Sequence, residues 1–337
     1  MNLSRFKGQY SSTSLFTRVN LFAFLLLIGL GFINTVHAED FPNKSIRWIL
    51  PYPPGGGGDI VARIVTPKLS LAAAQQIYVD YKPGGGTVIG TQTLLSSKAD
   101  GYTVMHTAEQ MAANSSLMKN LKYSAEKDVD FIGTMVKTPL VLLAKLDLPV
   151  SNAQEVIAYM KAEDKKVTYG SWGQGGMNHL TMEAFAARLN VNPVHAPYAG
   201  AAPAIKDLLG GVIDLYFSDL ATALPYIKDG KLKPLLVSSR TRIPLYPNLP
   251  TLQELGFDGF DMYSYQGLVA PKGLSPEVLN KLSELLRNTV NLPEVKSELS
   301  ARGFIPASST AAEFRTQFLD SQTLLGNVIR QRNISIE

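Results

Sequence analysis

Short apolar runs alternate with segments of helical periodicity through most of the chain, which is the pattern of an α/β protein. In the first third, strands are expected at 46–50, 77–81 and 102–106, with helices after the first two. Asp59 is expected to cap the first helix, and Pro67 to kink or shorten it. The connections are long enough for crossovers, so the sheets are expected to be largely parallel.

The middle of the chain repeats this alternation and then returns to the first unit. Its strands are expected at 140–144, 167–171, 194–198, 215–218 and 234–238. A return strand at 267–270 precedes two helices, at 276–288 and 311–330. We therefore expect two α/β lobes joined by two crossover segments, with a ligand cleft between them. Residues 39–142 plus 266–337 would form lobe 1, and residues 143–265 would form lobe 2.

The first 38 residues have the pattern of a signal peptide. Arg5, Lys7 and Arg18 precede an apolar run at 21–33, and Val36-His37-Ala38 supplies a small-x-small cleavage step. We expect export to the periplasm with cleavage after Ala38. The alternative, an uncleaved anchor helix, is less favoured because the run is shorter than the roughly 20 apolar residues of a membrane span.

Charge and cysteine content narrow the function classes. Lys and Arg total 32 against 28 Asp and Glu, and the leader holds three of the basic residues, so the mature chain would carry 29 against 28. Such a balance does not predict nucleic-acid binding, which needs a concentrated basic face. The absence of cysteine excludes disulfides, thiolate metal sites and cysteine nucleophiles. His106, His179 and His195 are too scattered for metal-ligand spacing, so no metal or cofactor is expected.

Four loops rich in glycine or other small residues each lie between an expected strand and an expected helix. They are 54–59, 83–87, 173–176 and 198–201, two in each lobe. In open α/β sheets such loops lie at the carboxyl ends of strands, where ligands bind. Glycine allows close backbone approach, and the free N–H groups of a helix start attract anions. The pattern predicts a shared cleft for an anion, although any one loop could be a simple tight turn.

No catalytic constellation accompanies these loops. The residues around Ser171 do not match a nucleophile elbow, and Ser116-Leu117-Met118-Lys119 lacks its companion motifs. His179 could line the ligand or cap a helix, and Tyr52, Trp172 and Tyr198 could cover a ligand or only pack. Asp219 could accept a hydrogen bond from a ligand amine or hydroxyl, or could simply be solvated.

Motifs along nearly the whole mature chain resemble the extracytoplasmic receptors of tripartite tricarboxylate transporters, the Bug family. In the first half they are Tyr52-Pro53-Pro54-Gly55-Gly56 with Asp59 and Arg63, Lys82-Pro83-Gly84 with Gly90, and Asp100-Gly101-Tyr102-Thr103. Later matches are Ser171, Gly173, Gly175 and His179-Leu180, Pro197-Tyr198 with Gly200, 208–214, Pro250-Thr251 with Glu254 and Gly256, and Gly267-Leu268 with Ala270-Pro271.

The resemblance implies a type II periplasmic-binding-protein fold whose lobes close on a small carboxylate. It implies that backbone groups of the first two loops hold one carboxylate, partly through waters. That end of the ligand would meet Tyr52, Gly55, Gly56, Gly57, Gly58, Asp59, Gly84, Gly85, Gly86 and Thr87. The selective end would meet Ser171, Gly175, Gly176, His179, Tyr198, Ala199 and Asp219. The protein would be a monomer that delivers its ligand to membrane permease subunits.

Some positions depart from the family pattern. Gly57-Gly58 replaces hydroxyl-bearing residues, Tyr81 an asparagine, Gly176 a serine, and Ala199 a longer side chain. With fewer polar groups, and with Trp172 nearby, the ligand could be an aromatic acid as well as a di- or tricarboxylate. Two other functions stay open: a carboxylate sensor that presents its closed form to a signalling partner, and a hydrolase that uses the same cleft.

Overall fold

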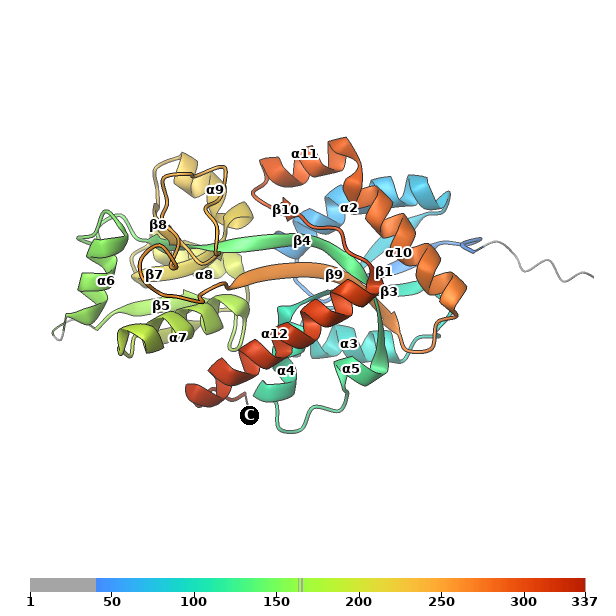
Figure 1. Ribbon diagram of the computed structural model, residues 1–337, viewed down its shortest axis with the longest axis horizontal. Helices are drawn as coiled ribbons and strands as arrows, with labels where there is room; N and C mark the ends of the chain where they lie inside the picture. The colour runs from blue at the N-terminus through green and yellow to red at the C-terminus, as the bar shows by residue number, and fades with distance from the viewer. Residues whose placement is uncertain (1–40, 163, 165, 337) are drawn as a thin grey trace, which may run out of the picture. The chain divides into compact units, whose positions relative to one another are not determined.

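A computed structural model describes residues 41–162, 164 and 166–336. The expected signal segment, 1–38, lies outside these residues. The described strands form one mixed sheet in the order β2-β1-β3-β9-β4-β7-β5-β6, with β8 and β10 also paired to β4. The centre of this sheet is the antiparallel pair of β4 (Val129–Ala144) and β9 (Tyr263–Pro271) (Figure 1).

On one side of this pair lies a parallel unit made of β1 (Ile46–Leu50), β2 (Ile77–Tyr81) and β3 (Thr103–Ala108). Its helices are α2 (Gly57–Ala73), α3 (Val88–Leu95), α4 (Glu109–Leu117), α5 (Ala125–Asp128), α10 (Pro276–Asn291), α11 (Pro293–Ala301) and α12 (Ala311–Gln331). A short 3-10 turn, η1 (Gly85–Thr87), precedes α3, and a short strand, β10 (Ile305–Pro306), precedes α12.

Successive side chains of β1 point to opposite faces of the sheet, which explains why helices cover both faces of this unit. Trp48 and Leu50 point into a core shared with α2, α10 and α11, whereas Ile49 points into one shared with α3, α4 and α12. Successive strand residues face opposite sides of a sheet, so an apolar strand such as IRWIL needs a helical layer on each side.

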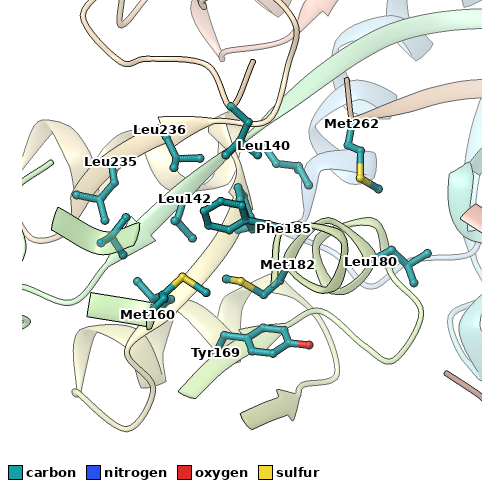
Figure 2. Close-up of a cluster of buried hydrophobic side chains, with 14 of the residues drawn as sticks. Leu140, Leu142, Met160, Tyr169, Leu180, Met182, Phe185, Leu235, Leu236 and Met262 are labelled. Carbon is teal, nitrogen blue, oxygen red and sulfur yellow. The ribbon is translucent and has the colours of Figure 1, made fainter. Parts of the chain in front are cut away.

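The other side of the central pair carries β5 (Thr168–Ser171), β6 (Val194–Pro197), β7 (Leu215–Asp219) and β8 (Lys233–Val237). Its helices are α6 (Ala153–Lys161), α7 (Met177–Leu189), α8 (Ala201–Leu209) and α9 (Leu220–Lys228). In its core, Leu140 and Leu142 of β4 lie against Phe185 and Met182 of α7, with Leu236 of β8 beside them (Figure 2).

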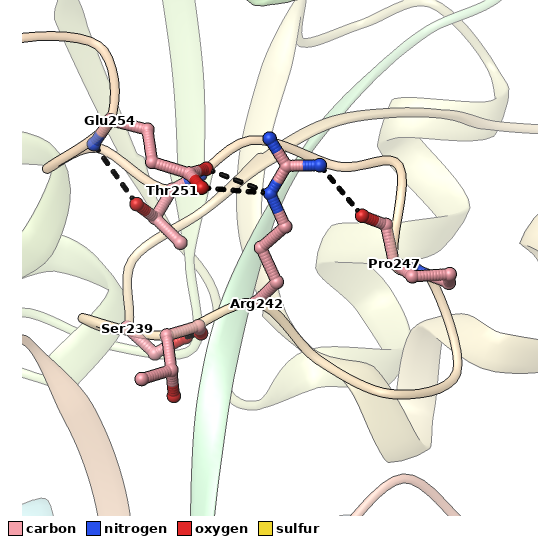
Figure 3. A network of polar contacts seen from close by, with 6 residues as sticks. Ser239, Arg242, Pro247, Thr251 and Glu254 are labelled. Atoms are coloured by element: carbon pink, nitrogen blue, oxygen red, sulfur yellow. Dashed lines mark hydrogen bonds and ion pairs between the residues drawn. The ribbon is translucent and has the colours of Figure 1, made fainter.

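A polar network holds the long connection between β8 and β9 (Figure 3). The Arg242 guanidinium donates to both carboxylate oxygens of Glu254 at 2.9 Å and to the Pro247 carbonyl at 2.8 Å. The Glu254 amide in turn donates to the Thr251 hydroxyl. This network gives a structural role to Thr251 and Glu254, two of the positions that resemble the family.

The structure corrects three expectations about the elements. Gly56, not Asp59, is the N-cap of α2, and Asp59 lies in its first turn. Pro67 lies inside α2, which continues to Ala73, so the helix is not shortened at Pro67. The sheet is mixed, because β4 runs antiparallel to β7, β8, β9 and β10. The residue limits expected for the two lobes remain a prediction, since β4 and β9 run without interruption past the expected crossing points.

Candidate functional site

A cavity of about 1240 Å³ opens where the four small-residue loops meet. Its wall includes these residues expected to bind: Tyr52, Gly56, Gly57, Gly58, Gly84, Gly85, Gly86, Thr87, Tyr198, Ala199 and Asp219. The others expected there are not part of the wall: Gly55, Asp59, Ser171, Gly175, Gly176 and His179. The structure thus gathers residues from distant parts of the sequence around one cleft.

The first loop presents a helix start that has no cap. Among the residues that the structure describes, α2 has no side-chain cap at its N-cap residue Gly56, so the N–H groups of its first turn are left for another acceptor. Gly57 and Gly58 carry those groups and lie in the cavity wall. An uncapped N-terminus of a 17-residue helix favours an anion through its N–H groups and its dipole.

Asp59 shapes this loop from behind. Its carboxylate accepts from the Gly55 amide at 2.9 Å and from Arg63, and the Tyr81 hydroxyl donates to it at 2.5 Å. Burial raises the pKa of this carboxyl, but the hydrogen bonds from Tyr81, Gly55 and Arg63 outweigh it and lower the pKa. Asp59 is therefore an ionised residue that stabilises the first loop, and the hydrogen bond from Tyr81 holds its carboxylate in place.

The second loop depends on backbone conformations that favour glycine. Gly84, Gly85 and Gly86 have φ of +127°, +57° and +59°, and Thr87 follows at +79°. Asn114, fully buried on α4, fixes this path by donating from Nδ2 to the Gly86 carbonyl at 2.8 Å and to the Tyr123 hydroxyl at 3.1 Å. Sequence reasoning missed Asn114, because no sequence motif identifies a distant side chain that hydrogen-bonds to the backbone of a loop.

The third loop lies beside the buried His179 and the half-buried His195. His179 Nδ1 accepts from the Gly175 amide at 2.9 Å, and its ring stacks on His195 at 3.9 Å between centroids. His195 Nε2 lies 2.7 Å from Ser171 Oγ, which also donates to the Gly173 carbonyl. Burial lowers the pKa of His179 to about 3 and that of His195 to about 4. Ser171 is fully buried outside the cavity wall, so this serine–histidine contact organises the loop and does not form an accessible nucleophile.

Gly175 and Gly176 in the same loop allow close packing. A Cβ at Gly176 would lie 2.5 Å from the Trp172 indole nitrogen, and one at Gly175 would overlap Leu117. Gly176 thus leaves room for Trp172, which lines the cavity, and Gly175 leaves room for Leu117.

The fourth loop adds a second uncapped helix start. In the described part of the chain, α8 has no side-chain cap at its N-cap residue Gly200. Ala199, Gly200 and Ala201 line the cavity. The Tyr198 ring also lines it, while its hydroxyl donates to Asp207 at 2.8 Å. Burial, reinforced by Asp207, raises the pKa of Tyr198 to about 12, so the ring is a neutral wall.

A polar floor lies between the loops. His106 Nε2 is 3.0 Å from Gln266 Oε1, and burial lowers the pKa of this fully buried histidine to about 4. The Tyr52 hydroxyl and the Thr138 hydroxyl are buried and have no hydrogen-bond partner within the described chain. Tyr52, Thr138 and Gln266 all line the cavity. Two buried hydroxyls that lack protein partners are groups that a ligand or water could satisfy.

Two buried acids also line the cavity. Glu109, in the first turn of α4, accepts from Ser264 Oγ at 2.9 Å, and burial raises the pKa of its carboxyl to about 7. Asp219 is the N-cap of α9 and accepts from the Thr222 amide at 2.8 Å, and burial raises its pKa as well. Glu109 was missed in the sequence, because α4 was not foreseen.

The cavity mouth carries basic residues and the C-terminal segment. Lys119 and Lys122 line it and are exposed. Ser335 and Ile336 line it too. The Ile336 amide donates to the Leu117 carbonyl at 3.0 Å, and Gln174 donates to the Ser335 carbonyl at 2.7 Å. This segment therefore joins the third loop to the end of α4.

Two negative findings concern the described residues alone. Within 41–162, 164 and 166–336, no group of three His, Asp or Glu side chains could hold a metal ion. In the same part of the chain, no helix is both long and apolar enough to cross a membrane.

Comparisons with known proteins agree on one family. Residues 61–334 match the family described as "Tripartite tricarboxylate transporter family receptor". Protein BugT of Bordetella pertussis is 29% identical over 326 residues, covering 95% of this chain and 100% of BugT. A protein encoded in the gbd 5' region of Cupriavidus necator is 34% identical over 263 residues, covering 78% of this chain and 80% of that protein.

Solved structures show the same fold. A periplasmic transporter aligns with a TM-score of 0.82 at 32% identity, and the periplasmic binding protein BugD aligns with 0.81 at 27%. Both alignments cover 88% of this chain and 100% of the other. R. palustris Rpa4515, solved with adipate, aligns with 0.83 at 24% identity over 88% of this chain and 99% of that one, which extends the likeness of fold. These likenesses confirm the expected two-lobed periplasmic-binding-protein fold. The chain belongs to the receptor family of the tripartite tricarboxylate transporters, the family that contains the Bug proteins.

Proposed function

We propose that this protein is a periplasmic receptor that binds one small carboxylate in its cleft and delivers it to the membrane subunits of a tripartite transporter. The observation that carries the proposal is the uncapped start of α2, whose residues Gly57 and Gly58 lie in the cavity wall. Each charge-assisted hydrogen bond to such an amide contributes about 1.5–3 kcal/mol. Several of them offset the dehydration of a carboxylate without an arginine.

The ligand would be a di- or tricarboxylate or an aromatic carboxylic acid. Its carboxylate would meet the amides of the first two loops, and the rings of Tyr52, Trp172 and Tyr198 would cover its carbon skeleton. The protein would act without catalysis, as a monomer, after cleavage at Ala38. N-terminal sequencing and size-exclusion chromatography of the exported protein test the last two points.

Two substitutions at Gly57 distinguish the effect of losing its N–H group from the effect of adding side-chain atoms. Gly57 is the first residue of α2, where proline is well tolerated, and the extended backbone of Gly56 suits a following proline. A Cβ at Gly57 would make ordinary contacts, 3.4 Å to Gln266 Nε2 and 3.6 Å to Asp219 Oδ1. Gly57→Ala therefore adds a methyl and keeps the N–H, whereas Gly57→Pro also removes the N–H.

The test is calorimetric titration of refolded protein with a panel of mono-, di- and tricarboxylates and aromatic acids. Refolding removes ligand carried over from the cell. We expect Gly57→Pro to bind about 10- to 100-fold more weakly than Gly57→Ala, the loss of one such hydrogen bond. Gly210→Ala, at the end of α8 and away from the cavity wall, is the control with unchanged affinity. Equal affinity of Gly57→Pro and Gly57→Ala would contradict the proposed carboxylate site.

Delivery has its own test. Deleting the gene should abolish uptake of the bound compound, and restoring the wild-type chain should recover it. Unchanged uptake with loss of a transcriptional or signalling response would instead identify a sensor.

A further inference from the structure

The wall of the cavity contains two kinds of helix start. Those of α2 and α8 have no capping side chain among the described residues, so they attract an anion. The starts of α4 and α9 carry the protein's own acids, Glu109 and Asp219. Acids at these positions neutralise the local dipole. One part of the cavity therefore favours a negative group, and another part already holds two carboxyls.

Neither acid has a cationic partner among the described residues. Glu109 is 3% exposed, and within the described part of the chain its carboxylate accepts from the Ser264 hydroxyl at 2.9 Å and from the Tyr265 amide at 3.4 Å. Asp219 is 8% exposed, and its carboxylate accepts from the amide and the hydroxyl of Thr222. The two carboxyls are close enough for the charge on Asp219 to disfavour ionisation of Glu109. Buried acids without a cation are unusual, because isolated buried charges cost several kcal/mol.

A buried hydroxyl in the cavity wall is an independent indication that a ligand binds near these acids. Thr138 of β4 is fully buried, lines the cavity, and its hydroxyl has no partner in the described chain. Thr138 pairs across the sheet with Ser264, whose hydroxyl donates to Glu109. Two residues further along β4, Leu140 pairs with Asp219. The central strand thus carries an unpartnered hydroxyl opposite the residue that donates to Glu109 and two residues from the one that pairs with Asp219.

The anion-attracting start of α2 and one of the two acids, Asp219, are close together. A Cβ built on Gly57, at the start of α2, would lie 3.6 Å from Asp219 Oδ1. A ligand whose carboxylate meets Gly57 would therefore place its neighbouring carbons beside this acid. A second carboxylate at that point would be repelled, whereas a positively charged group would be stabilised by both acids.

We propose that Glu109 and Asp219, with the Thr138 hydroxyl, form a subsite for an ammonium group, so that the ligand is an amino-substituted carboxylate. The inference rests on the proposed carboxylate site and specifies its ligand class. The short distance from Gly57 to Asp219 favours an amine only a few bonds from the carboxylate.

The test compares amino acids with their des-amino and hydroxy analogues on the refolded full protein. The probes are aspartate with succinate and malate, glutamate with glutarate and 2-hydroxyglutarate, and phenylalanine with 3-phenylpropanoate and 3-phenyllactate. We expect at least one amino compound to bind at least tenfold more tightly than both of its analogues. Glu109→Gln and Asp219→Asn should each reduce that ratio about tenfold and leave the des-amino compound bound as well or better.

Both variants are conservative. Gln keeps an acceptor for Ser264, and Asn is as good an N-cap as Asp. Glu277→Gln removes an exposed first-turn acid from α10, outside the cavity wall, and should leave the ratio unchanged.

The outcomes distinguish this inference from the proposed function. If carboxylates bind but the des-amino or hydroxy analogue equals the amino compound, the ammonium subsite is refuted and the carboxylate receptor stands. A preference for the amino compound that survives both variants also refutes the subsite. Absence of binding across the whole panel would overturn the receptor and the subsite together.

Discussion

Asn114 is the residue that holds the second glycine loop in place. It is fully buried and donates to the Gly86 carbonyl and the Tyr123 hydroxyl. Asn114→Ala leaves both acceptors without this donor and creates a small cavity, so we expect a loss of about 2–3 kcal/mol in the free energy of unfolding. Urea denaturation measures it, with the exposed Asn120→Ala as control. Equal stability of the two variants would show that the loop does not depend on Asn114.

At this scale, sequence reasoning identified backbone positions better than side-chain roles. Runs of glycine predict loops that can approach a ligand closely. Gly57, Gly58 and Gly84 from these runs line the cavity. Asp59 and His179 belong to the same motifs but turn away to accept hydrogen bonds from the loops. A motif fixes which residues are near the site, whereas the direction of a side chain depends on partners elsewhere in the fold.

Helix α2 carries a proline that its geometry tolerates at a cost. Pro67 lies inside the helix, its ring is exposed, and it cannot donate the intrahelical hydrogen bond of that position. We expect Pro67→Ala to raise the free energy of unfolding by about 1–2 kcal/mol, since the gain in the helix exceeds the entropy gained by the unfolded chain. Pro276→Ala is the matched control, because Pro276 is at the start of α10, where proline is favoured. A destabilised Pro67→Ala protein in thermal melts would contradict this reasoning.

Strands were predictable where they are short and bounded by turn residues. β1 and β2 have the limits expected from their apolar runs. β4 is far longer than the expected 140–144, because its first half contains Gly133, Thr134 and Lys137, which interrupt the apolar pattern. Its pairing with β9 stabilises that half, and long-range pairing leaves no local signal. The mixed character of the sheet could not be predicted either, because it too depends on long-range strand pairing.

Over the whole molecule, buried histidines make stability depend on pH. Burial lowers the pKa of His106 from 6.5 to about 4, so the unfolded chain binds more protons than the folded one between these values. Stability from this group is complete above pH 6.5 and is lost as the pH falls toward 4. His179 and His195 act in the same direction. Glu109, with its pKa raised to about 7, acts in the opposite direction between pH 4.5 and 7.

Because the titrations of these groups overlap in pH, a substitution at His106 is needed to isolate its contribution to stability. Between pH 7.5 and 4.5, His106→Gln should lose about 2 kcal/mol less unfolding free energy than the wild type. Urea denaturation at the two pH values measures this difference. Parallel losses in the two proteins would show that His106 titrates normally in the folded state.

The central claim is that backbone amides of the first two loops hold the carboxylate of the ligand. A crystal structure of the protein with its tightest-binding carboxylate tests it most directly. We expect carboxylate oxygens within about 3 Å of the amide nitrogens of residues 55–59 and 84–87, or joined to them through one water. A carboxylate bound instead to Lys119 and Lys122 at the cavity mouth, with those amides uninvolved, would contradict it.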